Sequence, residues 1–250
     1  MLLRKHFGDK LFMLPLCSPA GDQCPVDLVR WVEPESDVND PNLKRTNPHP
    51  RKADPSMFDL SGMRKAGKRV ANEIIEVYNE GLDAPQADPE LVHEVHNMQL
   101  PLRRTTFAEG AAARRRIHDY LAEKPGDVDF NDAAALQVDL GILRREELQE
   151  KMDILDTESH ILRLGTVAFA TNPFELFLDY GNQIKARSYA EQTFLVQLAG
   201  GSEGYLPTEK AEKGGHYSAF LASGLVGHAG GVGPGLLHQL EIKIQLGFQQ

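Results

Sequence analysis

The sequence predicts an α/β fold in which a mixed sheet is covered by helices. In some segments apolar residues recur every three or four positions, which is the period of an amphipathic helix. Short apolar runs rich in β-branched and aromatic residues lie between these segments and indicate strands. The chain has 250 residues, of which 41% are hydrophobic and 25% are charged. This is enough for one sizeable core, so we treat residues 1–250 as a single domain.

The N-terminal part combines a predicted strand with a predicted irregular stretch. Residues 11–16 are an apolar run that Pro19 and Gly21 bring to an end, so we expect a buried strand and then a tight loop. Residues 33–55 contain five prolines among polar and charged residues. We therefore expect an irregular surface excursion there.

Three helices and a strand are predicted for the middle of the chain. From Leu60 to Tyr78 the apolar positions follow a helical period, and Gly81 ends the pattern. Residues 92–104 indicate a strand. Thr106 and Glu109 then have the spacing of a capping box, which predicts a helix over residues 108–124. A third helix is expected over residues 132–152.

In the C-terminal part we expect a strand over residues 161–170, a helix from Pro173 to about residue 186, and a strand over residues 193–198. Asn172 would cap the helix, which makes Glu175 an early helical residue at the carboxyl end of a strand. Ligands bind at such strand ends in open α/β sheets. Alternatively, Glu175 only complements the helix dipole. Residues 231–250 begin with too many glycines for a helix and form an atypical tail.

The composition excludes several classes of function. The formal net charge is -9, which gives no basic surface for nucleic acid. No apolar run approaches the roughly 20 residues of a membrane-spanning helix. The N-terminus lacks the pattern of a signal peptide, so we expect a soluble, cytoplasmic chain. The chain has two cysteines, too few for a disulfide framework or a four-cysteine zinc site.

Two segments carry candidate chemistry of their own. Residues 199–219 are rich in glycine and hold Tyr205 and Tyr217, whose phenols could ligate a metal or donate to an oxyanion, or could simply anchor a loop. The neighbouring His216 is a further candidate, as is His228. In AGDQCP, Cys24 is placed to act as a nucleophile, although buried cysteines more often serve as small hydrophobes.

The segment His93-Glu-Val-His96 resembles a metal-binding motif but lacks the i, i+4 spacing of a zinc-protease helix. In a strand, its two histidines would point to opposite faces of the sheet. We therefore interpret them as surface or structural residues.

The order of these segments resembles that of the neutral, non-lysosomal ceramidase family. GDQCP, at residues 21–25, is similar to the Gly-Asp-x-Ser-Pro loop of that family, and NPFELF, around Glu175, is similar to its Pro-x-Glu motif. Tyr205 and Tyr217 are 12 positions apart, the separation of two tyrosines in the family. The resemblance covers most of the chain and is weakest in residues 33–55 and after Gly230.

The resemblance implies a zinc ion held by two histidines together with Glu175 and Tyr205, with Tyr217 at the carbonyl of the scissile amide. Cys24 stands where the family has a serine that is its proposed nucleophile or nucleophile-assisting group. The two zinc histidines of the family lie far upstream of the loop, and here only His6 precedes Gly21, so neither is assigned. The implied protein is a zinc-dependent hydrolase of N-acyl amides such as ceramide. As given, the chain would be a partial catalytic domain without the N-terminal histidine region and the C-terminal immunoglobulin-like domain.

Three alternatives remain open at this point. The chain could be a non-catalytic remnant of that family. It could be a metal-independent cysteine hydrolase that uses Cys24 with a histidine such as His216, or a module that binds lipid or glycan without hydrolysis. If an N-terminal strand region is missing, an exposed sheet edge would favour self-association.

Overall fold

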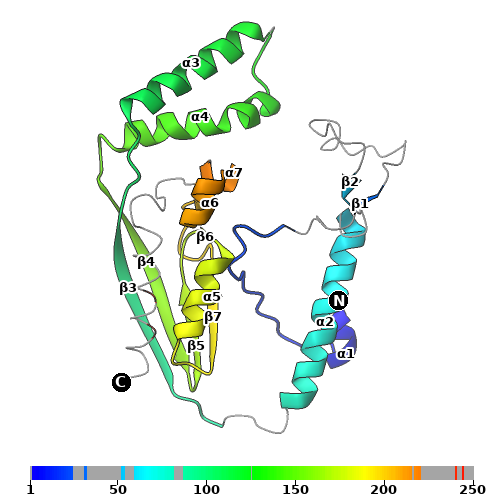
Figure 1. The fold of residues 1–250 in the computed structure, drawn as a ribbon. Coiled ribbons are helices and arrows are strands. Elements are labelled where there is room, and N and C mark those ends of the chain that lie inside the picture. Colours follow the sequence, from blue (N-terminus) through cyan, green and yellow to red (C-terminus); the bar gives the residue numbers. More distant parts are fainter. Residues whose placement is uncertain are drawn as a thin grey trace. The chain divides into compact units, whose positions relative to one another are not determined.

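The computed structural model describes residues 2–24, 31–32, 52–53, 59–81, 87–124, 126–215, 217–220, 240 and 244 (Figure 1). Its contacts form two compact units. The first comprises Met1–Leu14 and Cys24–Ala87, and the second comprises Pro15–Gln23 and Asp88–Gln250. That the chain forms a single domain stays a prediction.

The first unit contains two helices and a pair of very short strands. Helix α1 spans Leu2–Phe7, and α2, spanning Asp59–Gly81, confirms the predicted long helix. The two helices touch through Phe7 and Tyr78, whose ring centroids are 4.7 Å apart in an edge-to-face arrangement. Strand β1 (Trp31–Val32) pairs antiparallel with β2 (Lys52–Ala53).

Strand β2 lies within residues 33–55, and the irregular excursion expected there stays a prediction. The rest of the excursion lies outside the described residues.

The prediction of a strand over residues 11–16 is wrong. These residues adopt no regular structure, and Phe12 and Leu14 are 99% and 82% exposed. Pro15 interrupts the run, and no described strand pairs with it.

A mixed four-stranded sheet forms the centre of the second unit. Its strands are β3 (Leu91–Pro101), β4 (Ile154–Leu164), β5 (Val167–Thr171) and β7 (Gln192–Val196), and they lie in the order β3-β4-β5-β7. The first two pairings are antiparallel, and β5 pairs parallel with β7. Helices and a mixed sheet confirm the predicted α/β class.

The single strand predicted over residues 161–170 is in fact part of a hairpin. Leu164 pairs with Val167, which leaves a two-residue loop of Gly165 and Thr166. Gly165 has φ 57°, and a glycine with positive φ in the first loop position matches a type of turn that joins antiparallel strands.

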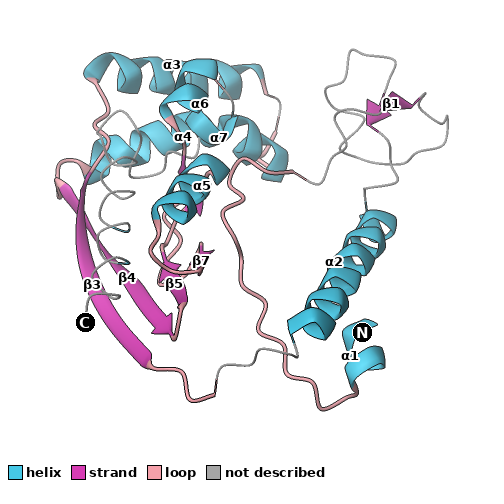
Figure 2. Cartoon of the chain, turned by 60° about the horizontal axis from the view of Figure 1, so that its bottom comes forward, coloured by secondary structure: helices cyan, strands magenta, loops and turns pink. Residues whose placement is uncertain are grey.

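Helices α3 (Phe107–Glu123) and α4 (Phe130–Leu148) form a hairpin inserted between β3 and β4 (Figure 2). The predicted capping box at the start of α3 is confirmed. Glu109 N donates to Thr106 Oγ1 over 3.2 Å, and Thr106 N donates to Glu109 Oε2 over 2.8 Å. Arg116 bonds to Asp139 at 2.6 Å and ties the two helices together. The third predicted helix begins and ends earlier than expected.

The ends of the helical hairpin meet at the end of the β3–β4 ribbon. Leu102 N donates to Asp153 O over 3.0 Å. The side-chain amide of Gln149 both accepts from Thr105 N, at 2.8 Å, and donates to Thr105 O, at 3.1 Å. The insertion is therefore held closed at its base by paired hydrogen bonds.

The core lies on one face of the sheet, under helix α5 (Leu178–Arg187). Two strands of two residues each, β6 (Glu175–Leu176) and β8 (Tyr205–Leu206), border it. Its members include Met98, Leu100, Ile161, Ala168, Ala170, Phe174, Leu176, Phe177, Ile184, Leu195 and Leu206. Of the predicted tail, Leu240 and Ile244 are described. Both are helical and buried in this core.

None of the helices in the described ranges has both the length and the apolar character that a membrane crossing requires.

Candidate functional site

The two predicted metal ligands lie opposite each other in the β6–β8 pair. These strands run parallel, and their register pairs Glu175 with Tyr205 and Leu176 with Leu206. Glu175 N donates to Gly204 O over 2.8 Å. Because paired residues of adjacent strands project to the same side, the carboxylate of Glu175 and the phenol of Tyr205 share one face.

The opposite face of this pair determines its register. Leu176 and Leu206 are 1% and 0% exposed, whereas Glu175 and Tyr205 are only partly buried. A slip by one residue would bring the leucines to the outer side and the carboxylate into the core. The ring of Tyr205 also contacts Phe177, edge to face, with the centroids 6.4 Å apart.

The predicted position of Glu175 in the first turn of a helix is wrong. Helix α5 begins only at Leu178, so Glu175 belongs to a strand. Asn172 Oδ1 accepts from Phe174 N over 3.1 Å and turns the chain directly after β5. Phe174 and Leu176 then alternate into the core. This alternation favours extended backbone over a helix.

The loop at Gly21 and Asp22 lies directly against β6 and α5. Gly21 N donates to Leu176 O over 2.9 Å, and Asp22 Oδ1 accepts from Leu178 N over 2.8 Å. Asp22 thereby caps α5, whose own N-cap residue, Phe177, makes no side-chain cap bond. The three segments on which the family resemblance depends thus meet in space.

Gln197, which follows β7, holds this assembly together, and sequence reasoning did not identify it. Its Oε1 accepts from Ala20 N at 3.1 Å and from Leu176 N at 3.0 Å, and its own N donates to Cys17 O at 2.9 Å. It is only 6% exposed. The one available signal was a glutamine at the end of the apolar run FLVQLAG.

The structure describes the two predicted catalytic residues, Cys24 and Tyr217, in less detail than the two predicted metal ligands. Cys24 is exposed and belongs to the first unit, whereas Gly21 and Asp22 belong to the second. Tyr217 begins α7 (Tyr217–Phe220), a short helix that contacts β8 and α6 (Glu209–Gly214). The side chain of Tyr217 lies outside the described atoms, as do His216 and His228.

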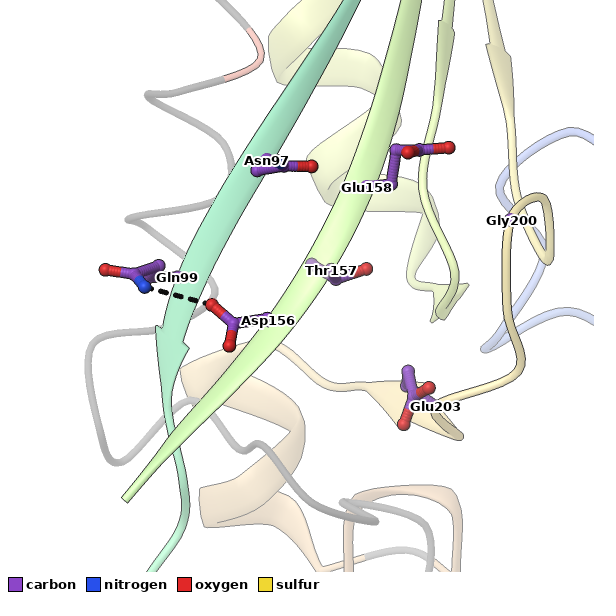
Figure 3. A pocket seen from close by; sticks show the side chains of 7 residues that line it. All are labelled: Asn97, Gln99, Asp156, Thr157, Glu158, Gly200 and Glu203. Carbon is purple, nitrogen blue, oxygen red and sulfur yellow. Dashed lines mark hydrogen bonds between the residues drawn. The ribbon is translucent and has the colours of Figure 1, made fainter. Parts of the chain in front are cut away.

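A polar groove of about 660 Å³ lies between the β3–β4 ribbon and the loop that precedes β8 (Figure 3). It is lined by Asn97, Gln99, Asp156, Thr157, Glu158, Gly200 and Glu203. Glu203 N donates to Pro173 O over 2.9 Å, and the next residue, Gly204, accepts from Glu175. The loop that forms one wall of the groove therefore leads directly into the Glu175–Tyr205 pair. Three carboxylates make the groove electronegative.

Tyr180 supports the same region from α5. Its hydroxyl donates to Pro207 O over 3.0 Å, two residues after Tyr205. Burial, and to a lesser extent the charge of Glu212, raise the pKa of Tyr180 well above the usual tyrosine value. The phenol therefore stays protonated and continues to donate over the whole physiological range of pH.

Glu175 and Tyr205 carry side-chain oxygens of the types that can ligate zinc. Zinc accepts carboxylate oxygen, and next to a metal a phenol can ionise and ligate, while a catalytic site normally has three protein ligands and a water. Across the residues that the structure describes, no group of three or more His, Cys, Asp or Glu side chains is arranged to hold a metal.

Comparisons with protein-family models, with curated proteins and with solved structures return no match for this chain.

Proposed function

We propose that this chain is a zinc-dependent hydrolase of N-acyl amides, similar in reaction to the neutral ceramidases. Glu175 and Tyr205 would be two of its zinc ligands, and the remaining ligands would come from outside the described residues. The pairing of Glu175 with Tyr205 on one face of β6–β8 carries the proposal. Zinc would supply a hydroxide from bound water and polarise the amide carbonyl.

The other residues of the site have supporting roles under this proposal. Asp22 and Gln197 hold the loop of residues 20–22 against β6, so the backbone that carries Glu175 is bonded on both sides. The groove beside Glu203 would admit the polar part of the substrate. Tyr217 would donate a hydrogen bond to the developing oxyanion.

Zinc content measured together with amide hydrolysis tests the proposal. We expect one zinc per purified chain, no zinc in Glu175→Ala, and less zinc in Tyr205→Phe. Glu191→Ala and Tyr189→Phe are matched controls, because both residues are exposed on the same unit, and they should keep the metal. Cleavage of a fluorogenic N-acyl amide should follow the zinc content. A folded chain that binds no zinc at micromolar free metal, or variants of Glu175 and Tyr205 that bind it normally, would contradict the proposal.

A second candidate function is that of a non-catalytic scaffold. One observation favours it: the motif residues Gly21 and Asp22 have complete structural roles, one in a close backbone contact with Glu175 and the other as the cap of α5. Under this alternative, Asp22→Ala lowers stability and the chain neither binds zinc nor hydrolyses amides. The same zinc measurement therefore separates the two candidates.

A further inference from the structure

Two histidines lie together on the outer face of the β3–β4 ribbon. His93 Nε2 and His160 Nδ1 are 3.0 Å apart, and the ring planes differ by 13°. His93 is opposite Leu162 and His160 is opposite Val95, so the histidines are diagonal neighbours on one face. The buried Met98 and Leu100 project to the other face, which is the core side.

A carboxylate fixes the proton on one of these rings. His160 Nε2 lies 2.8 Å from Glu158 Oε1, and Glu158 is two residues away on the same strand face. An ionised carboxylate only accepts, so in the neutral form of His160 the proton is on Nε2 and Nδ1 has a lone pair that faces His93. With His160 in this form, His93 Nε2 is the donor in the metal-free pair. Metal-bound histidines are commonly held in this way, with the second nitrogen bonded to a carboxylate.

We propose that His93 and His160 form a copper(II) site, with Nε2 of His93 and Nδ1 of His160 as ligands and Glu158 as the outer partner. At metal–nitrogen distances of about 2.0–2.1 Å, nitrogens 3.0 Å apart subtend about 95° at the metal. A tetrahedral angle would need nitrogens about 3.3–3.4 Å apart at the same bond lengths. Angles near 90° belong to tetragonal copper(II) or nickel(II), with water in the remaining positions.

Metal binding requires only local changes at this face. The proton of His93 moves from Nε2 to Nδ1 by exchange with solvent, so both rings ligate as neutral imidazoles and no redox step is involved. The rings must turn until both lone pairs point at the metal while the two nitrogens stay near their present separation, and rotation about χ2 of histidine is soft. His93 is exposed and His160 is partly exposed, so there is space for this rotation.

Copper(II) titration of the full chain tests the site, by calorimetry with glycine as a competing ligand and by electron paramagnetic resonance. We expect one copper per chain, with hyperfine coupling from two imidazole nitrogens. In His93→Gln and His160→Gln the affinity should fall by about 100-fold or more, because the chelate is lost. In Glu158→Gln, which keeps both imidazoles, it should fall by about 10-fold to 100-fold.

Two variants serve as controls. His96→Gln changes a histidine on the opposite face of β3 that is bonded to Glu94 at 2.7 Å, and it should leave copper affinity unchanged. Glu175→Ala removes a proposed zinc ligand and should also leave copper affinity unchanged, so the two proposals fail separately. Absence of stoichiometric copper from the parent chain would overturn the copper site. Parent affinity in both His93→Gln and His160→Gln would overturn it equally.

Discussion

Replacing Gly21 by alanine tests how closely the loop of residues 20–22 is packed against β6. A Cβ atom at this position would lie 2.3 Å from the carbonyl oxygen of Glu175 and 2.8 Å from its carbonyl carbon. Both are main-chain atoms, which cannot rotate away as the end of a flexible side chain could. The loop and β6 would have to separate by about 1 Å to restore an ordinary contact, which begins at 3.4 Å.

The cost of this separation has two parts. Forcing a methyl group into a packed site costs about 1–3 kcal/mol. The hydrogen bond from Gly21 N to Leu176 O, now 2.9 Å, would also be stretched, at about 1 kcal/mol. We therefore expect Gly21→Ala to lower the free energy of unfolding of the second unit by about 2–4 kcal/mol.

Urea unfolding followed by far-ultraviolet circular dichroism measures this loss. The single tryptophan, Trp31, belongs to the first unit, so its fluorescence is not a probe of the second unit. Gly214→Ala is the matched control, because a Cβ there meets nothing within 4 Å. It should change stability by no more than about 0.5 kcal/mol. If Gly21→Ala behaves like this control, with an unchanged denaturant slope, the close contact does not exist in solution.

Two further predictions concern ionisable residues. The pKa of Glu109 is lowered chiefly by the hydrogen bond from the backbone N–H of Thr106, so its contribution to stability is present above the usual glutamate pKa and is lost as pH falls through the lowered value. The difference in unfolding free energy between the parent and Glu109→Ala should therefore shrink between about pH 6 and about pH 3, and a constant difference would refute this. Tyr180→Phe leaves the buried carbonyl of Pro207 without its donor, and should cost about 1–2 kcal/mol in urea unfolding. Burial raises the pKa of Tyr180. The stability that the Tyr180 hydroxyl contributes is therefore complete below the usual tyrosine pKa and falls as pH rises above about 10. In an absorbance titration, Tyr180→Phe should remove a tyrosine that ionises well above the usual tyrosine pKa. Loss of a tyrosine that ionises near the usual value would contradict the raised pKa of Tyr180.

Elements with local signals could be predicted from the sequence. The long helix α2 follows from its apolar period, and the start of α3 follows from Thr106 and Glu109, because capping involves residues only three positions apart. The strand β3 was also found. Its partner β4 was only half recognised, because residues 154–160 place polar side chains such as Asp156 and Glu158 on the outer face and lack a continuous apolar run.

Features that depend on tertiary partners could not be predicted. The run of residues 11–16 has the composition of a strand, but backbone hydrogen bonds need a neighbour, and no described strand provides one. Glu175 follows Asn172 and Pro173, a local pattern that favours the start of a helix. The contacts of Leu176 in the core stabilise a strand there instead.

The candidate site shows the same division. The resemblance selected Glu175 and Tyr205, but nothing in their spacing of thirty residues indicates that they are register partners. Gln197 was missed because a single buried amide leaves no periodic trace in the sequence. The pairing of His93 with His160 likewise depends on the register of β3 and β4, which the sequence does not specify.

The helical hairpin α3–α4 bears on how the ribbon forms during folding. Strands β3 and β4 are separated by about fifty residues, and closing an unstructured loop of that length before any pairing would be slow. Helices form in about a microsecond, and once α3 and α4 pack together, Leu102 and Asp153 are already neighbours. We therefore expect the rate at which the sheet assembles to depend on capping residues such as Thr106 and Asp129, which contribute no side chain to the sheet.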